Sequence, residues 1–480
     1  MPRQDAGRRR LQGQGPGRHQ GPARRSLLRP RIAAGRTRSL HGHQQRGQVL
    51  PAQTALPVLQ PHPVPAGRHR GPEGLRRDGH LRQPRRHPAG GRSVNALLDA
   101  FFGIPPFWLG AIGSVLVIFL VVLPAVIVMV LWERKFLGML TQRPGPNRVG
   151  GRFGLLQTVA DALKLLTKED FTPKDADHKL FFIAPVLFMA PTFLVYAVIP
   201  FGHFGGKDYA PAIIADLRTG VFFLAAVFSI HTVAILMAGW ASNNKYSLMG
   251  GIRGVAQAIS YELPLVFSFL GVVLLTGSMS TVDMVRAQDG WFYNWFCFAQ
   301  PVAFLIYLIC AVAEVNRVPF DIPEAESELV SGFNTEYSGM RFAMFFLAEY
   351  ASLLAVSALA ATVFLGGWNA PFPTPAAIAA STVGMFVWSV AWFTLKVAVL
   401  ITVAIWVRGT LPRLRADQLM NFAWKALVPL VLINIFATGL LGLWGRPAVA
   451  AGMWLAIALF WAYGAARTPR FHERRRRVAF

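Results

Sequence analysis

Residues 218–239 read RTGVFFLAAVFSIHTVAILMAG, and after the opening arginine His231 is the only ionisable side chain in the stretch. A helix needs about 20 consecutive apolar residues to cross ~30 Å of hydrocarbon. The stretch meets that length, so it predicts a transmembrane helix. We interpret His231 as a polar side chain satisfied inside the protein, with a functional role as the alternative.

Similar apolar runs recur along the 480 residues, 53% of which are hydrophobic. They cover 107–131, 181–200, 255–276, 296–313, 343–366, 382–407, 423–444 and, more briefly, 448–466. Only helices or closed barrels satisfy their backbone in lipid, and runs of this length fit helices. We therefore predict an all-α polytopic membrane protein with about eight to nine transmembrane helices.

An amphipathic surface helix is expected at 153–168, in the polar connector after the first run. Its predicted faces are an apolar stripe of Leu156, Val159, Leu163 and Leu166 and a polar side of Gln157, Asp161, Lys164 and Lys168. Such a helix can lie along a membrane surface and wall an entrance for a lipid-soluble molecule.

Residues 1–94 differ from the rest of the chain in composition. They hold 20 arginines, no lysine, three acids and no aromatic residue, and so carry +17 of the formal net charge of +24. This composition cannot build a core and predicts disorder. Three interpretations stay open: a nucleic-acid-binding arm, a targeting segment, or a spurious extension from GC-rich DNA read in the wrong frame or from too early a start. We favour the last, with the native start near Val94, and expect no nucleic-acid partner.

The distribution of Lys and Arg predicts the orientation of the spans. Connectors 132–180, 240–254, 314–342 and 408–422 and the tail after 466 hold nine, two, two, three and six of them, whereas each intervening connector holds one at most. Positive residues near spans mark the cytoplasmic side. The connector 314–342 and the basic tail 468–480 are therefore expected in the cytoplasm.

Six carboxylates crowd the connector 314–342, EVNRVPFDIPEAESELVSGFNTEYSGMRF, which we call the acidic connector. Further ionisable residues lie within the predicted spans, namely Glu262, Glu349 and Lys396, while Glu314 ends the fifth span. Charges inside a membrane are costly and mark functional sites by default. Carboxylates that titrate only when desolvated or paired suit proton handling. The two cysteines have no ligand spacing for an iron–sulfur cluster.

Several longer motifs resemble a known family. They are ERKFLGMLTQRPGPNRVG, QTVADALKLLTKED, ISYELP, AEVNRVPFDIPEAESELVSGFNTEYSGMRFAMFFLAEY and RGTLPRLRADQLMNFAWK. Together they resemble the H subunit (subunit 1 in mitochondria) of respiratory NADH:quinone oxidoreductase, complex I, which is a membrane subunit. The resemblance covers about 100–467. Residues 95–467 would then form a quinone-tunnel transmembrane domain of a multi-pass protein in the bacterial inner (plasma) membrane.

The resemblance implies a translocase subunit without a redox centre of its own. Quinone is the substrate, and NADH, FMN and Fe–S clusters belong to partner subunits. Those partners would be the hydrophilic quinone-module subunits and small membrane subunits beside the antiporter-like ones, with membrane lipids around them. The implied proton path is Glu262, Glu314 and Glu349, together with Glu324, Glu326 and Glu328 of the acidic connector. The implied tunnel residues are Glu133, Arg134, Asp161, Lys164, Arg413, Arg415 and Asp417.

Two other functions stay open at this point. One is the homologous membrane anchor of a membrane-bound hydrogenase-type complex. The other is a stand-alone ion transporter, which would need inverted repeats and a midplane site.

Overall fold

The computed structural model describes residues 116–467 apart from 117, 152, 206–209, 376–377 and 379–380. The predicted extension 1–94, the tail 468–480 and the start of the first apolar run lie outside the described residues.

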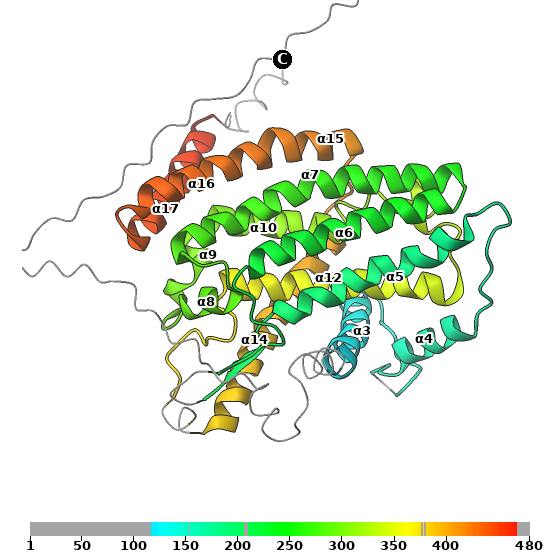
Figure 1. The fold of residues 1–480 in the computed structure, drawn as a ribbon, viewed down its shortest axis with the longest axis horizontal. Coiled ribbons are helices and arrows are strands. Elements are labelled where there is room, and N and C mark those ends of the chain that lie inside the picture. The colour runs from blue at the N-terminus through cyan, green and yellow to red at the C-terminus, as the bar shows by residue number, and fades with distance from the viewer. Residues whose placement is uncertain are drawn as a thin grey trace, which may run out of the picture. The chain divides into compact units, whose positions relative to one another are not determined.

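Helices dominate the described part of the chain (Figure 1). The longer ones are α3 (Leu123–Leu140, after the π-helical turn η1, Ile118–Val122), α4 (Gln157–Thr167), α5 (His178–Val195), α6 (Gly220–Ala241), α7 (Lys245–Thr276), α10 (Pro301–Glu314), α12 (Gly339–Phe364), α14 (Thr382–Thr410), α16 (Val428–Gly442) and α17 (Arg446–Arg467). Shorter elements are η2 (Tyr196–Val198), α8 (Thr281–Arg286), η3 (Phe292–Asn294), α9 (Phe296–Ala299), α11 (Glu326–Leu329), η4 (Gly332–Asn334), α15 (Ala416–Phe422) and η5 (Ala423–Leu427). Strands β1 (Gly202–Phe204) and β2 (Ala210–Ala212) pair antiparallel.

Six helical segments of the described residues are long and apolar enough to cross a membrane. They are His178–Val198, Gly220–Ala241, Lys245–Thr276, Gly339–Phe364, Thr382–Thr410 and Ala416–Gly442. The shorter apolar helices Pro301–Glu314 and Arg446–Leu459 coincide with two further predicted runs, and α3 continues the first one. The predicted all-α multi-pass class is confirmed.

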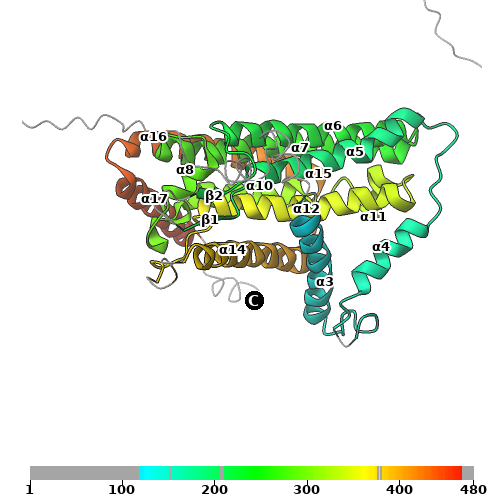
Figure 2. The ribbon, with the colours of Figure 1, turned by 60° about the horizontal axis from the view of Figure 1, so that its bottom comes forward.

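Helices α5, α6, α7, α10 and α12 run alongside one another, whereas α3 crosses them steeply (Figures 1 and 2). Buried tyrosine hydroxyls tie these helices together. Tyr196 donates to the Ala351 carbonyl at 2.7 Å, and Tyr307 donates to the Val356 carbonyl, also at 2.7 Å. Both tyrosines are buried, and each hydroxyl thereby satisfies its own donor.

Helix α7 starts at Lys245, ten residues before the predicted apolar run begins at 255. The run did not include these first turns because they are polar and glycine-rich. The acidic connector fills the space beside these turns. On α7, Gln257 Nε2 donates to the carbonyl of Ala313 near the end of α10 (2.8 Å) and to that of Phe320 in the connector (2.7 Å). Nearer the start of α7, Ser247 donates to the Phe333 carbonyl at 3.2 Å. Together with the contacts of Asn244, Gly250 and Gly254, they recur every three or four residues and so follow one face of α7.

Glycine is required where this connector touches α7. A Cβ built on Gly250 would stand 2.6 Å from the Cα of Gly332, which is closer than real Cβ contacts. At its outer end, Asn244 donates to Glu336 at 2.6 Å. The small residues of α7 therefore let an irregular chain lie directly against the helix.

The amphipathic surface helix is confirmed as a helix, α4, although it starts four residues later than predicted. Three of the four predicted stripe residues lie within it and Leu156 precedes it; all four are exposed, with Leu163 58% and Leu166 59% accessible. No part of the described chain covers this stripe, which leaves an apolar surface of the kind that meets lipid or a partner.

Lys396 closes the end of α12. Its ammonium donates to the carbonyls of Leu365 (2.6 Å), Gly367 (2.9 Å) and Asn369 (2.5 Å), and it lies 4.2 Å from the centre of the Trp295 ring. These carbonyls belong to the residue that caps α12 and to the loop after it, and a cation there also complements the helix dipole. These contacts support a structural role for Lys396.

Candidate functional site

A network of two carboxylates and two arginines, centred on the buried Glu133 and Arg317, joins four separate parts of the chain. Arg317 lies in the acidic connector. It donates from Nη1 to both carboxylate oxygens of Glu133 on α3 at 3.1 Å, and its Nε lies 2.7 Å from Glu349 on α12. Arg408 on α14 pairs with Glu133 from the other side. The Arg317 guanidinium also stacks over the Tyr350 ring, 4.1 Å from its centre.

The network borders a cavity of about 340 Å³. Polar walls come from Asp321, Glu324, Ser331 and Asn334 of the acidic connector and from Arg413 after α14, and aromatic walls come from Phe342, Phe346 and Tyr350. Arg413 pairs with Asp321 at 3.0 Å, and Asn334 donates to Glu324 at 2.7 Å. The cavity thus combines charged and aromatic surfaces.

Burial controls the protonation of the two connector carboxylates in this cavity. Desolvation raises the pKa of Asp321 to about 6, although the charge of Arg413 acts in the opposite direction. Desolvation also raises the pKa of Glu324 well above its ordinary value, and the charges of Glu349 and Asp321 add to the effect. Both groups are therefore closer to titrating at neutral pH than exposed carboxylates are.

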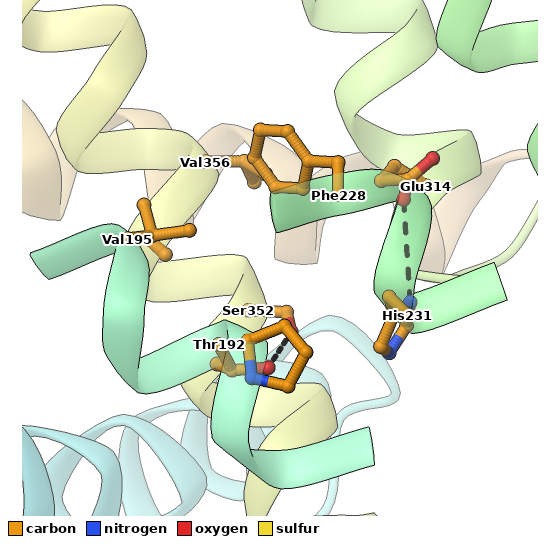
Figure 3. Close-up of a pocket in the computed structure, with 9 residues that line it drawn as sticks. Thr192, Val195, Phe228, His231, Glu314, Ser352 and Val356 are labelled. Atoms are coloured by element: carbon orange, nitrogen blue, oxygen red, sulfur yellow. Dashed lines mark hydrogen bonds and ion pairs between the residues drawn. The ribbon is translucent and has the colours of Figure 1, made fainter. Parts of the chain in front are cut away.

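Glu314 lies at the end of α10, away from this network. Its side chain is buried, and its Oε1 is 4.0 Å from Nδ1 of His231 on α6 (Figure 3). Glu262 lies farther along the same set of helices, on α7, where it accepts a hydrogen bond from Ser229 of α6. Ser229 is exposed and Glu262 is half-buried, so Glu262, unlike Glu314, reaches the surface of the subunit.

The remaining expected site residues lie at the surface. Arg134 on α3 pairs with Asp161 on α4, and Arg253 pairs with Glu328 at 2.6 Å. Lys164, Arg415 and Asp417 are exposed and form no ion pair within the described part of the chain. The Glu326 backbone begins α11, but its side chain lies outside the described residues.

Comparisons with known proteins identify the family. A family profile described as NADH dehydrogenase matches residues 113–439. A Geobacillus thermodenitrificans protein, named as the H subunit of NADH-quinone oxidoreductase, is 53% identical over 335 residues, which are 70% of this chain and 93% of that protein. Proteins of the same name from Geobacillus kaustophilus (53% over 324 residues; 68% and 91%) and Bacillus cytotoxicus (51% over 312 residues; 65% and 88%) are similar.

The chain belongs to the H-subunit family of NADH-quinone oxidoreductase. It is therefore a membrane subunit of that multi-subunit enzyme complex. Helix α17 lies beyond the part that the family profile matches. Among the described residues, no group of three or more His, Cys, Asp or Glu side chains could hold a metal ion.

Sequence reasoning found the carboxylates of this oxidoreductase subunit but missed their cationic partners. Arg317 and Arg408 were not expected as site residues, and neither was Asp321. The available signal was weak: Arg317 is one of two arginines in a connector with six acids, and Arg408 directly follows an apolar run. Buried carboxylates need such partners, but which cation supplies the charge depends on the fold, because Arg317 and Arg408 are 184 and 275 residues from Glu133 in the sequence.

Proposed function

We propose that this subunit forms the passage by which a quinone leaves the lipid and approaches the redox centres of partner subunits. We also propose that it begins the row of ionisable groups that couples quinone reduction to proton translocation. The observation that carries both proposals is the Glu133–Arg317–Glu349–Arg408 network, buried at Glu133 and Arg317, beside a cavity of about 340 Å³.

The walls of this cavity suit a quinone head group. Phe342, Phe346 and Tyr350 offer faces for a planar ring, and the arginines offer donors for its two carbonyl oxygens. Ligand sites commonly combine apolar walls with a few convergent polar groups. NADH, FMN and the Fe–S clusters would reside in hydrophilic partner subunits that dock on the acidic connector.

The apolar stripe of α4 supports an entrance at the membrane surface. Its exposed leucines can lie against lipid, while Asp161 on the same helix pairs with Arg134 of α3. From the Lys and Arg counts we also propose that this helix and the acidic connector lie on the cytoplasmic side of the membrane, which the resemblance implies is a bacterial inner membrane.

Quinone reduction takes up two electrons and two protons. The negative charge that the electrons bring can couple the reduction to protonation of nearby carboxylates. A negative charge in the cavity at ~10 Å from a carboxylate, with an effective dielectric of about 20, is worth ~1.7 kcal/mol, or about 1.2 in pKa. Asp321 and Glu324, whose pKa values are already raised by burial, would take up a proton first. A membrane potential opposes proton transfer by ~2.3 kcal/mol per 100 mV. Several groups must therefore act in sequence, and Glu349, Glu314 and Glu262 are the candidates.

The test replaces Glu349 by glutamine in the assembled complex in native membranes. We expect quinone-linked NADH oxidation and proton pumping to fall at least about tenfold, since the neutral amide leaves the network with an unbalanced cation. NADH oxidation by a water-soluble acceptor controls for assembly. Asp170→Asn, which removes a carboxylate paired with Arg341 outside the cavity, is the matched control. Unimpaired coupled activity in Glu349→Gln would refute the proposal.

A further inference from the structure

A small enclosed cavity lies beside Glu314, and its walls carry four polar side chains from four helices (Figure 3). His231 belongs to α6 and Glu314 to α10, while Thr192 of α5 and Ser352 of α12 face them. The two hydroxyl oxygens of Thr192 and Ser352 are 3.0 Å apart. The volume is about 10 Å³, close to the room that a single water molecule needs.

The two titratable side chains on this cavity are deeply buried. Glu314 is 4% exposed and His231 is 6% exposed. Both carboxylate oxygens and the imidazole Nε2 lack a hydrogen-bond partner within the described part of the chain. Buried polar groups in proteins are nearly always satisfied by protein or by ordered water. This pair is therefore an unusual arrangement that needs a physical explanation.

The distance between the pair indicates what connects them. Nδ1 of His231 and Oε1 of Glu314 are 4.0 Å apart, which is too long for a direct hydrogen bond. One water molecule on the cavity wall could bridge the two atoms and bond to the Thr192 and Ser352 hydroxyls as well. A buried water typically makes two to four such bonds.

We propose that His231 accepts a proton from Glu314 through a single water held by the Thr192 and Ser352 hydroxyls, which makes His231 a further member of the proton path. In this step Glu314 loses the proton from its carboxylic acid, the water relays it, and Nδ1 of His231 gains it. The acid becomes carboxylate and the imidazole becomes imidazolium. The net charge of the pair does not change, so the step creates no unbalanced charge in the membrane interior.

The surroundings of His231 suit a transient cation. The Phe188 ring lies 4.0 Å from the imidazole, centre to centre, and an aromatic face attracts a positive charge. The new carboxylate of Glu314 would stand on the other side as its counter-ion. The other titratable groups whose electrostatics couple to Glu314 are Glu262 on α7 and Tyr307 and Cys310 on α10 itself. The polar side chains that α5 and α12 present to this cavity are the hydroxyls of Thr192 and Ser352; their other lining residues are apolar.

This inference rests on the proposed role of Glu314, so the experiment compares three variants of the assembled complex in native membranes. They are Glu314→Gln, His231→Asn and the double variant. Asparagine can keep a hydrogen bond near the Nδ1 position but cannot hold the extra proton. Quinone-linked NADH oxidation and protons pumped per NADH are measured, and oxidation by a water-soluble acceptor reports assembly. His231→Gln replaces His231→Asn if the latter does not assemble.

We expect each single variant to lose about tenfold or more in coupled rate, and the double variant to be no worse than Glu314→Gln, because the two residues act in one step. The control Thr232→Val, at the next buried position of α6, should keep the full rate. Thr192→Val combined with Ser352→Ala should slow coupling, whereas Thr362→Val, which removes a buried hydroxyl of α12 elsewhere, should not.

The outcomes separate the two proposals. A fully active Glu314→Gln overturns the proposed coupling role itself. An impaired Glu314→Gln with a fully active His231→Asn leaves that role standing and overturns this inference, as do additive losses in the double variant. Full activity after removal of both hydroxyls overturns the water-mediated step.

Discussion

Removal of Arg317 should destabilise the subunit more than removal of any exposed arginine of the cavity. The network contains two arginines and two carboxylates, so its formal charge is zero. Arg317→Met leaves Glu349 without an ion-pair partner among the described residues, while Glu133 retains Arg408. The side chain also loses its position over the Tyr350 ring.

The expected cost follows from burial. The Arg317 side chain is 6% exposed and that of Glu349 is 17% exposed. Removing one partner of a buried pair typically costs ~3–5 kcal/mol, because the other charge is left uncompensated. The Arg413–Asp321 pair borders the same cavity, but the Arg413 side chain is 40% exposed. A pair of that kind is worth about 1 kcal/mol or less, so Arg413→Met is the matched control.

Thermal inactivation of the assembled complex measures the difference. A loss of ~3 kcal/mol that falls on the unfolding step accelerates inactivation about 10²-fold, and ~1 kcal/mol only about fivefold. The double variant Arg317→Met/Glu349→Met restores a neutral network with one ion pair, so it should recover most of the loss. The reasoning fails if Arg317→Met inactivates no faster than Arg413→Met, or if the double variant is less stable than Arg317→Met.

Three further predictions concern other parts of the fold. Lys396→Met should cost about 3 kcal/mol in thermal inactivation, because three carbonyls at the end of α12 lose a charged donor; an unchanged rate would contradict the structural role. Burial raises the pKa of Asp321 from 3.8 to about 6, so the folded subunit binds a proton that the unfolded chain has released. Stability should therefore fall as pH rises from about 4 to 6, by at most about 3 kcal/mol, and Asp321→Asn should flatten that dependence when inactivation is followed across this pH range. Gly250→Ala would place a Cβ 2.6 Å from the Cα of Gly332 and should cost ~1–3 kcal/mol; a subunit as heat-stable as the wild type would show that the connector moves aside freely.

The apolar runs predicted the spans well because membrane insertion sums a small preference over about 20 residues. Because that preference is summed over apolar residues, the first ten residues of α7 were left out of the predicted span. Lys245, Ser247 and Arg253 lower the hydropathy there, although Asn244 caps the helix and accepts a hydrogen bond from the Tyr246 amide. What covers these polar turns is the acidic connector, and no local pattern in α7 records that contact.

The candidate site could be predicted only in part, for a related reason. Glu349 was named because a charge within a span is conspicuous by itself, whereas Glu133 was named only through the resemblance. Their partners were missed because Arg317 is 184 residues from Glu133 in the sequence, and pairing depends on how helix ends meet in space. Glu314 was found, but its nearness to His231 depends on the packing of α6 against α10. From the sequence we assigned Glu314 to the implied proton path and interpreted His231 as a polar side chain satisfied inside the protein, without a reason to connect them.

The contact between the acidic connector and α7 also has an electrical consequence. From Asn244 to Gln257 the helix rises about 20 Å, and over that length one of its faces lies against the irregular, polar acidic connector, while α6 packs on another face. A region rich in carboxylates, amides and carbonyl dipoles insulates poorly compared with packed hydrocarbon side chains. Where this face lies within the membrane, the voltage would fall less steeply along it than through packed apolar helices, and more steeply over the rest of the thickness. The energy for each proton carried across stays ~2.3 kcal/mol per 100 mV, but the field that acts on it is concentrated in a shorter stretch of the protein.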